Sequence, residues 1–173
     1  MNKDEAQLRM ELAVNKIKDS SLRDFVFEVL SHLPAQAWQR EASLKYHHPD
    51  EREPGGNILH ELRVATLADL ISEVCNLKPL DRDLVRAAAL LHDCCRHGLN
   101  ADEKWTTKNH ANLVRTFIEK TCKPSNWTNP VCDIIETHMS RWGIPPYIPQ
   151  MDLRDILVIA DYVTSLPIVK VQE

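Results

Sequence analysis

The stretch VRAAALLHDCCRHG, residues 85–98, carries an apolar run that ends in the pair His92-Asp93. Apolar residues recur at intervals of three and four here and along the rest of the chain, which holds only four glycines. This periodicity is typical of α-helices, and no stretch alternates as a half-buried strand would. A buried carboxylate is costly unless it is paired or bound to a metal, so Asp93 also indicates a polar site inside the protein.

Further helices are expected on both sides of this stretch. They cover about residues 4–18, from Ser20 to Leu33, 57–76, from Asp81 to Asp93, 108–121, 130–140 and from Asp152 to just before Pro167. The expected N-caps are Asp81, Thr106 or Thr107, and Asp152, because short polar side chains accept hydrogen bonds from free N–H groups. Residues 41–56 and the polar stretch 97–107 are expected as loops, the second a candidate lid. The sequence therefore predicts an all-α bundle of about six to eight helices.

The size and charge of the chain limit its organisation and its partners. With 173 residues, 43% of them hydrophobic, we expect a single domain over 1–173, with N-terminal helices in 1–40 and the polar site in 41–167. The net charge of −4 does not favour long nucleic acid or an anionic membrane as a partner. We find no leader and no apolar stretch of bilayer length. A soluble, cytoplasmic protein is expected, and a homodimer is left open.

Five cysteines, an odd number, stand in the sequence without CxxC spacing: Cys75, Cys94, Cys95, Cys122 and Cys132. This pattern fits neither a disulfide framework nor a thiolate zinc site, so we expect buried or free thiols. Metal ligation by Cys94 or Cys95, which adjoin Asp93, remains an alternative.

Several ionisable residues fall on apolar helix faces. His60, His110 and His138 each share a face with aliphatic residues, and Asp161 lies within ILVIADYV, residues 156–163. Taken singly, such a histidine is more often a hydrogen-bonded core residue, and Asp161 would equally suit a partner arginine. Six such residues on five expected helices, counting the pair His92-Asp93, are better explained by convergence on a shared ion.

Three stretches resemble the HD superfamily of metal-dependent phosphohydrolases, whose signature is a histidine, then a His-Asp pair that ends a helix, then a distant aspartate. They are GGNILHELRVATLADLI (55–71), AAALLHDCCRHG (87–98) and VIADYVTSL (158–166). Residues 46–63 and 134–163 also resemble the corresponding segments of HD-domain 3′-5′ exoribonucleases. The resemblance spans about Tyr46 to Leu166 and implies an HD-domain helical bundle.

The resemblance also implies a set of metal ligands. Members with four ligands hold one divalent ion through the residues that match His60, His92, Asp93 and Asp161. A subset adds two histidines and holds two ions bridged by the aspartate of the pair, and His110 and His138 match those positions. Imidazole and carboxylate ligands suit Fe, Mn, Zn, Co or Mg, so one or two divalent ions are the expected cofactor.

The chemistry implied is hydrolysis of a phosphoester or phosphodiester by a metal-activated water, with a small nucleotide-like or other phosphoester molecule as substrate. The HD-GYP signature is not in the sequence, and Arg96 replaces the lysine often found three residues after the aspartate. Specificity for cyclic di-GMP is therefore not expected. Asp93 and Arg96 are the expected catalytic residues, with Arg96 as a phosphate clamp or, alternatively, in a surface ion pair.

Cations near the ligands in the sequence are the expected substrate contacts: Arg63, Arg96, Lys104, Lys108 and Arg141. Each of them taken alone would also suit a solvated surface. Trp105 and Trp142 would suit stacking on a base, with core packing as the alternative. His47 and His48, in the loop before His60, receive no role.

Two other functions are compatible with the same residues. Some HD-fold proteins with this ligand set hold two irons and activate oxygen to cleave a carbon bond. A ligand-binding module that has lost catalysis is less favoured, because no ligand position is missing.

Overall fold

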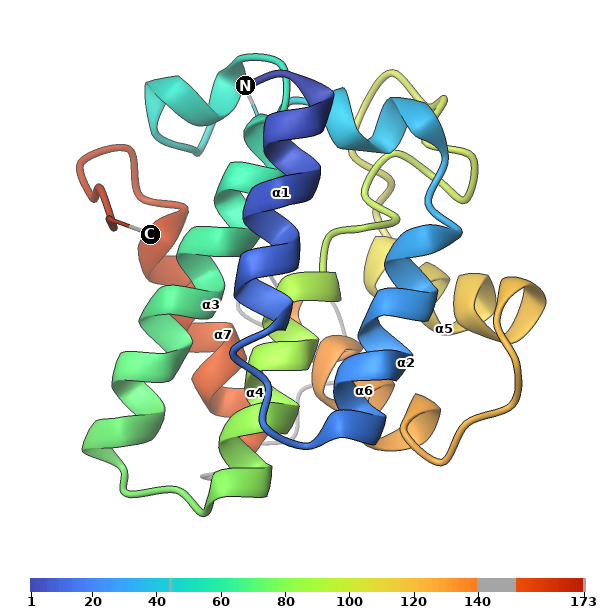
Figure 1. Cartoon of the computed structure of the whole chain (residues 1–173). Helices are drawn as coiled ribbons and strands as arrows, with labels where there is room; N and C mark the ends of the chain where they lie inside the picture. The colour runs from blue at the N-terminus through green and yellow to red at the C-terminus, as the bar shows by residue number, and fades with distance from the viewer. Residues whose placement is uncertain (44, 140–151, 173) are drawn as a thin grey trace.

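The computed structural model describes residues 1–43, 45–139 and 152–172, and within them the fold is all-helical. Its helices are α1 (Lys3–Val14), α2 (Ser20–Ser31), α3 (Gly56–Val74), α4 (Pro79–Leu91), α5 (His110–Thr121), α6 (Thr128–Ile135) and α7 (Leu153–Thr164). Two 3₁₀ turns, η1 (Ala35–Gln39) and η2 (Pro49–Arg52), lie between α2 and α3. Figure 1 shows the arrangement. The prediction of an all-α bundle is confirmed.

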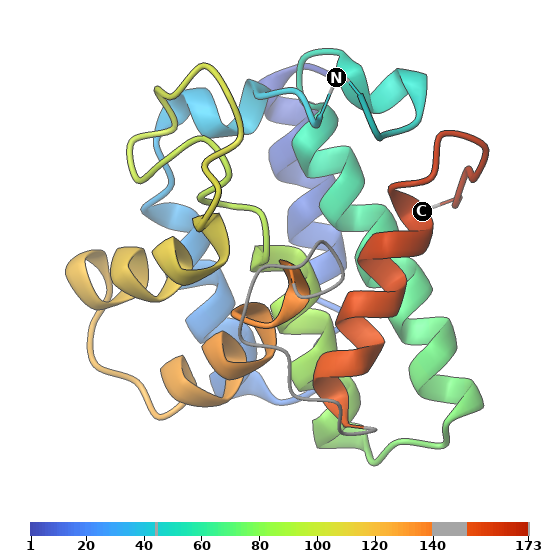
Figure 2. The ribbon, with the colours of Figure 1, turned by 180° about the vertical axis from the view of Figure 1, so that it is seen from behind.

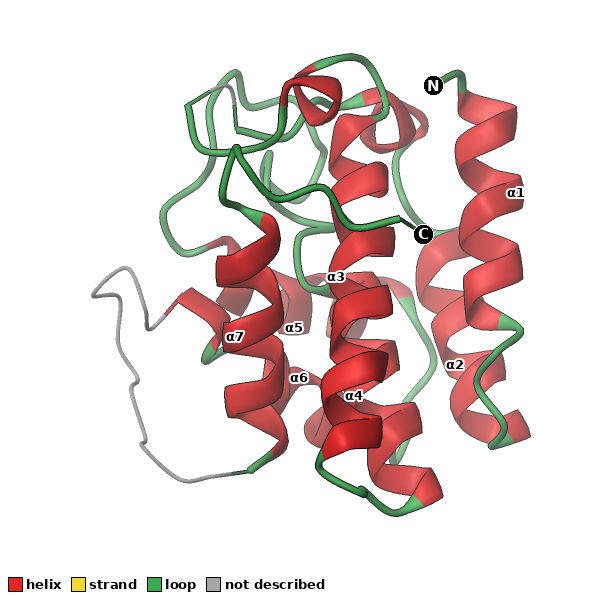
Figure 3. Ribbon diagram, turned by 90° about the vertical axis from the view of Figure 1, so that its left-hand side faces the viewer, coloured by secondary structure: helices red, strands yellow, loops and turns green. Residues whose placement is uncertain are grey.

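The long helices α3 and α4 form the centre of the bundle. Figure 3 shows them between α7 on one side and α1 and α2 on the other, and Figure 2 shows α7 running beside α3 from behind. Nearly the whole of the α4 segment from Ala87 to Leu91 is inaccessible to solvent, as are Ile58, Val64 and Leu157 on the helices that cover it. The apolar run that ends in His92-Asp93 is thus the core of the fold.

The predicted helices agree with the structure in most places, whereas one of the three predicted N-caps is observed. Asp152 caps α7, since its side chain accepts a hydrogen bond from the N–H of Arg154, as expected. The cap predicted at Asp81 is wrong: α4 begins at Pro79, whose fixed φ suits the first helical position, and Asp81 lies in the first turn. The loop predicted over 41–56 contains the short η2 turn.

The caps predicted at Thr106 or Thr107 are also wrong, because α5 begins later, at His110. The Thr106 hydroxyl instead accepts a hydrogen bond from Arg96 Nε, and the Thr107 carbonyl accepts one from the N–H of His110. The two threonines therefore form hydrogen bonds with Arg96 and His110 and do not cap α5.

The five cysteines are free thiols, with Cys94, Cys95 and Cys132 buried, which confirms that prediction. None of the helices in the described residues combines the length and apolarity that a bilayer crossing requires.

Candidate metal centre

The six predicted ligands come from five parts of the bundle and meet in its interior. His60 lies in the middle of α3, and Asp161 lies on α7. His92 is the C-cap of α4, and Asp93 follows it. His110 opens α5, and His138 follows α6. All six residues are buried, as the helical faces predicted.

His60, His92 and Asp161 form one half of the site. Asp161 Oδ1 lies 3.0 Å from His60 Nε2 and 3.8 Å from His92 Nε2. One ligand atom from each of the three residues fits within a cluster small enough for a single ion. Helices α3, α4 and α7 deliver these atoms, so their mutual packing determines the geometry.

Asp93 lies between this half and a second one. Its Oδ2 is 3.8 Å from His92 Nε2, whereas its Oδ1 is 2.9 Å from His110 Nε2 and 3.6 Å from His138 Nε2. His92, Asp93 and His138 form a further cluster of ion size. A carboxylate that faces both halves has the placement of a bridging ligand.

Backbone carbonyls orient three of the histidine rings. The Nδ1 atoms of His92, His110 and His138 lie 2.8, 2.7 and 2.8 Å from the carbonyl oxygens three residues earlier. A carbonyl only accepts, so each Nδ1 carries a proton, and in the neutral ring each Nε2 presents its lone pair to the site. This tautomer is the one that binds a metal through Nε2.

The donor set fits a cation and does not satisfy itself. His110 Nε2 and His138 Nε2 lie 3.1 Å apart, and with this tautomer both are acceptors. His92 Nε2 and Asp93 Oδ1 are buried and make no hydrogen bond within the described residues. Buried acceptors without donors are rare in proteins, and a shared cation explains them together.

The electrostatics of the site favour ligand-competent protonation states of His92 and Asp93. Burial lowers the pKa of His92 to about 4, although Asp93 and Asp161 oppose the shift. The pKa of Asp93 lies well below its usual range, because Arg96, His92 and His110 outweigh the effect of burial. His92 is therefore neutral and Asp93 ionised at neutral pH, as metal binding requires.

His60 and Asp161 are a tightly coupled pair. Burial would lower the pKa of His60, but the carboxylates of Asp161 and Glu51 outweigh it and raise that pKa to about 10. The pKa of Asp161 falls below its usual range, since His60, His92 and His138 outweigh its burial. His60 is therefore protonated at neutral pH, and a metal ion bound there would have to displace this proton.

A cavity of about 180 Å³ opens beside the second half of the site. Its described lining consists of Ser43, Tyr46, His47, Asp93, Arg96, Thr106, His110, His138, Met139, Asp161 and Ser165. Arg96 Nη1 donates to Asp93 Oδ2 at 2.6 Å, and its Nε donates to Thr106. Arg96 is thus a buried cation on the cavity wall, and the surface ion pair offered as its alternative is not observed.

The other predicted substrate contacts lie away from this lining. Arg63 donates to both carboxylate oxygens of Asp50 and to Glu51. Lys104 and Lys108 are exposed, with Lys104 over the ring of Trp105, which is itself 67% exposed. Arg141 and Trp142 lie outside the described residues. Among the predicted cations in the described part of the chain, Arg96 is the one that lines the cavity.

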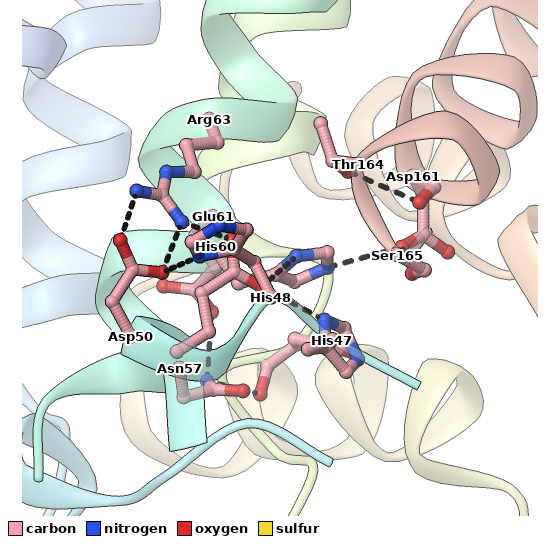
Figure 4. A network of polar contacts seen from close by, with 12 residues as sticks. His47, His48, Asp50, Asn57, His60, Glu61, Arg63, Asp161, Thr164 and Ser165 are labelled. Carbon is pink, nitrogen blue, oxygen red and sulfur yellow. Dashed lines mark hydrogen bonds and ion pairs between the residues drawn. The ribbon is translucent and has the colours of Figure 1, made fainter. Parts of the chain in front are cut away.

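The sequence analysis missed Glu51, which is fully buried beside His60. Its carboxylate accepts hydrogen bonds from Arg63 and, at 2.9 Å, from His47 Nδ1. Figure 4 shows His47, His60 and Arg63 in the polar network of which these contacts are part. His47, left without a role, lines the cavity. The sequence offered little signal for Glu51, because it sits in the charged run PDERE, which is typical of an exposed loop.

The family model of the HD domain matches residues 57–166, which is more than half of the chain. The chain therefore belongs to the HD family, a superfamily of metal-dependent hydrolases, as the three sequence stretches indicated. No curated protein and no solved structure matched the chain.

Proposed function

We propose that this protein is a metal-dependent phosphohydrolase that acts on a small nucleotide-like phosphoester or phosphodiester. The observation that carries the proposal is the placement of Asp93. Its two oxygens face separate groups of ligands, and the adjacent cavity has Arg96 on its wall. Membership of a hydrolase superfamily supports the same chemistry.

His60, His92 and Asp161 would hold one divalent ion, and His110 and His138 a second, with Asp93 shared between them. Divalent ions in such a site supply an activated water and neutralise charge on a phosphate group. The three carbonyl-bound imidazoles keep their Nε2 lone pairs directed inward, so little rearrangement of the chain is required on binding.

Arg96 would orient the substrate phosphate. Its Nη1, Nε and Nη2 are engaged by Asp93, Thr106 and His47, but a guanidinium has five N–H donors, so two remain for a phosphate in the cavity that Arg96 lines. The same ion pair holds the Asp93 carboxylate in place. Arg96 therefore links the ligand that both ions would share to the group that would contact the phosphate.

The first test is the metal content of protein purified without a chelator. We expect nearly two ions per chain in the wild type and a fall toward one in His110→Ala and in His138→Ala. His32→Ala, which changes an exposed histidine that caps α2, is the matched control and should keep the wild-type content. Absence of bound metal in the wild type would overturn the proposal.

Activity then separates hydrolysis from the oxygenase alternative. We expect Mn- or Zn-loaded protein to release p-nitrophenol from mono- and bis(p-nitrophenyl) phosphate without oxygen. A protein that binds only iron and reacts only in oxygen would instead be the carbon-bond-cleaving enzyme that shares this ligand set.

A further inference from the structure

We propose that Glu51 and His47 form an outer layer of the metal centre, in which Glu51 orients the His60 ring and His47 connects it to Arg96 and Asp93. Both lie before the family-matched residues 57–166, and neither is one of the six predicted ligands. The inference rests on the proposed metal centre and assigns it two positioning residues.

His60 needs an orienting group that the other histidines obtain from the backbone. His92 is the C-cap of α4 and His138 follows α6, so each lies near helix carbonyls without an intrahelical partner, and His110 opens α5 just after the Thr107 carbonyl that its Nδ1 contacts. His60 lies inside α3, where the carbonyls already accept hydrogen bonds of the helix. Its Nδ1 is buried and makes no hydrogen bond in the described part of the structure.

The carboxylate of Glu51 stands at this unpartnered nitrogen. Oε2 of Glu51 lies 3.4 Å from His60 Nδ1, while His60 Nε2 points the other way, 3.0 Å from Asp161. A small rotation of the ring toward Glu51 would complete a hydrogen bond from Nδ1. A carboxylate that accepts from the second nitrogen of a ligating histidine fixes its tautomer and raises its basicity.

The backbone brings Glu51 to this position by a contact that needs glycine. A Cβ atom on Gly56 would lie 1.8 Å from the carbonyl oxygen of Glu51, so η2 can close on the first turn of α3 only without a side chain there. The same carbonyl accepts from the N–H of Ala42, and Arg63 Nη1 donates to Glu51 Oε1 at 2.7 Å. Backbone and side chain of Glu51 are thus both held in place.

His47 extends the layer to the other half of the site. Arg96 Nη2 lies 3.3 Å from His47 Nε2, and because arginine only donates, that nitrogen accepts and Nδ1 donates to Glu51. Arg96 in turn donates to Asp93. The chain of contacts from His60 through Glu51, His47 and Arg96 therefore ends on the carboxylate that both ions would share.

The test measures zinc affinity by competition with a chelator, together with the imidazole nitrogens of His60 by NMR. We expect Glu51→Ala to weaken zinc binding roughly 10- to 100-fold, as loss of such a carboxylate does elsewhere, and Glu51→Gln to weaken it less. His47→Gln should fall between Glu51→Gln and the wild type. Asp50→Asn is the matched control, since Asp50 lies in the same turn and also pairs with Arg63 but makes no contact with His60.

In zinc-loaded wild type, NMR should find the His60 proton on Nδ1 and protected from exchange, and Glu51→Gln should expose it to faster exchange. This readout needs no destabilising variant, so it decides the question even where Glu51→Ala fails to fold. Wild-type zinc affinity in both Glu51 variants, with unchanged exchange at His60, would overturn the role of Glu51. A wild type that binds no zinc would instead overturn the metal centre itself.

Discussion

At the residue scale, Arg63 illustrates how position in the sequence differs from position in the site. It lies one turn after His60 and was expected to contact substrate phosphate. In the structure it is buried and its guanidinium pairs with Asp50 and with the fully buried Glu51. Its charge stabilises two carboxylates that would otherwise repel each other and the ionised aspartates of the site.

We therefore predict that Arg63→Ala acts on stability more than on substrate affinity. Removing one partner of a buried ion pair leaves the other charge uncompensated and costs about 3 kcal/mol. Urea denaturation should show this loss, whereas KM for a phosphoester should stay close to the wild-type value. A raised KM at unchanged stability would contradict this prediction and support the substrate contact that the sequence suggested.

At the scale of elements, the η2 turn and the start of α3 form a unit with the metal centre. Gly55 has a left-handed φ of 78°, which lets the chain turn sharply, and Gly56 permits the close approach of the Glu51 carbonyl. The Gly-Gly pair of the HD-like stretch thus has a defined structural role, because it allows the preceding turn to pack against His60.

Gly56→Ala should lower stability and zinc affinity together. The added methyl group must displace η2, at a cost of about 1–3 kcal/mol for overpacking, and Glu51 would move with it. Asp83→Ala is a suitable comparison, because Asp83 accepts hydrogen bonds from the N–H groups of Lys18 and Asp19 at the α1–α2 turn. That variant should lose stability, measured by thermal unfolding, and keep its zinc affinity; equal loss of affinity in both would contradict the prediction.

At the scale of the whole molecule, the bundle brings acidic and imidazole groups from α3, α5, α7 and the residues that end or follow α4 and α6 into one interior. An ion bound there would link these helices, so ion binding and folding should be coupled. Chelation should therefore lower the melting temperature of the whole bundle in a single transition.

The size of this fall in melting temperature on chelation should depend on pH. The raised pKa of His60, about 10, means that its proton stabilises the chelated protein fully below the unfolded value near 6.5, and that this stabilisation is lost as pH rises through 10. A metal must displace the same proton, so its affinity should rise up to about tenfold per pH unit between pH 7 and 9. His92, whose pKa is about 4, is already neutral between pH 7 and 9 and releases no proton when a metal binds.

We expect the difference in melting temperature between metal-loaded and chelated protein to widen from pH 7 to pH 9. At 100 times the dissociation constant, a ligand stabilises by about 2.7 kcal/mol, which is roughly 5–10 °C for a domain of this size. Calorimetric titration in two buffers should report release of a proton on binding. A difference that is constant with pH, with no proton released, would show that His60 is not a ligand.

The sequence by itself determined the helical class, most helix positions, the HD family and the six buried ionisable residues. These follow from periodicity and from residues whose burial is costly, and both are local properties of the chain. The cap at Asp152 was also predictable, because capping depends on a short polar side chain next to the helix and is likewise a local property. The start of α4 was predictable too, since Pro79 favours the first helical position, although Asp81 was chosen as the cap. The start of α5 was not, because contacts with Arg96 and His110 shaped it.

Only the tertiary structure decided which neighbours these residues have. It placed Asp93 between two groups of imidazoles, buried Arg96 against it, and turned Arg63 toward Asp50 and Glu51. It also brought Glu51, from a charged run typical of an exposed loop, to the free nitrogen of His60. Distances between segments far apart in the chain depend on how whole helices pack, and periodicity within one helix carries no information about them.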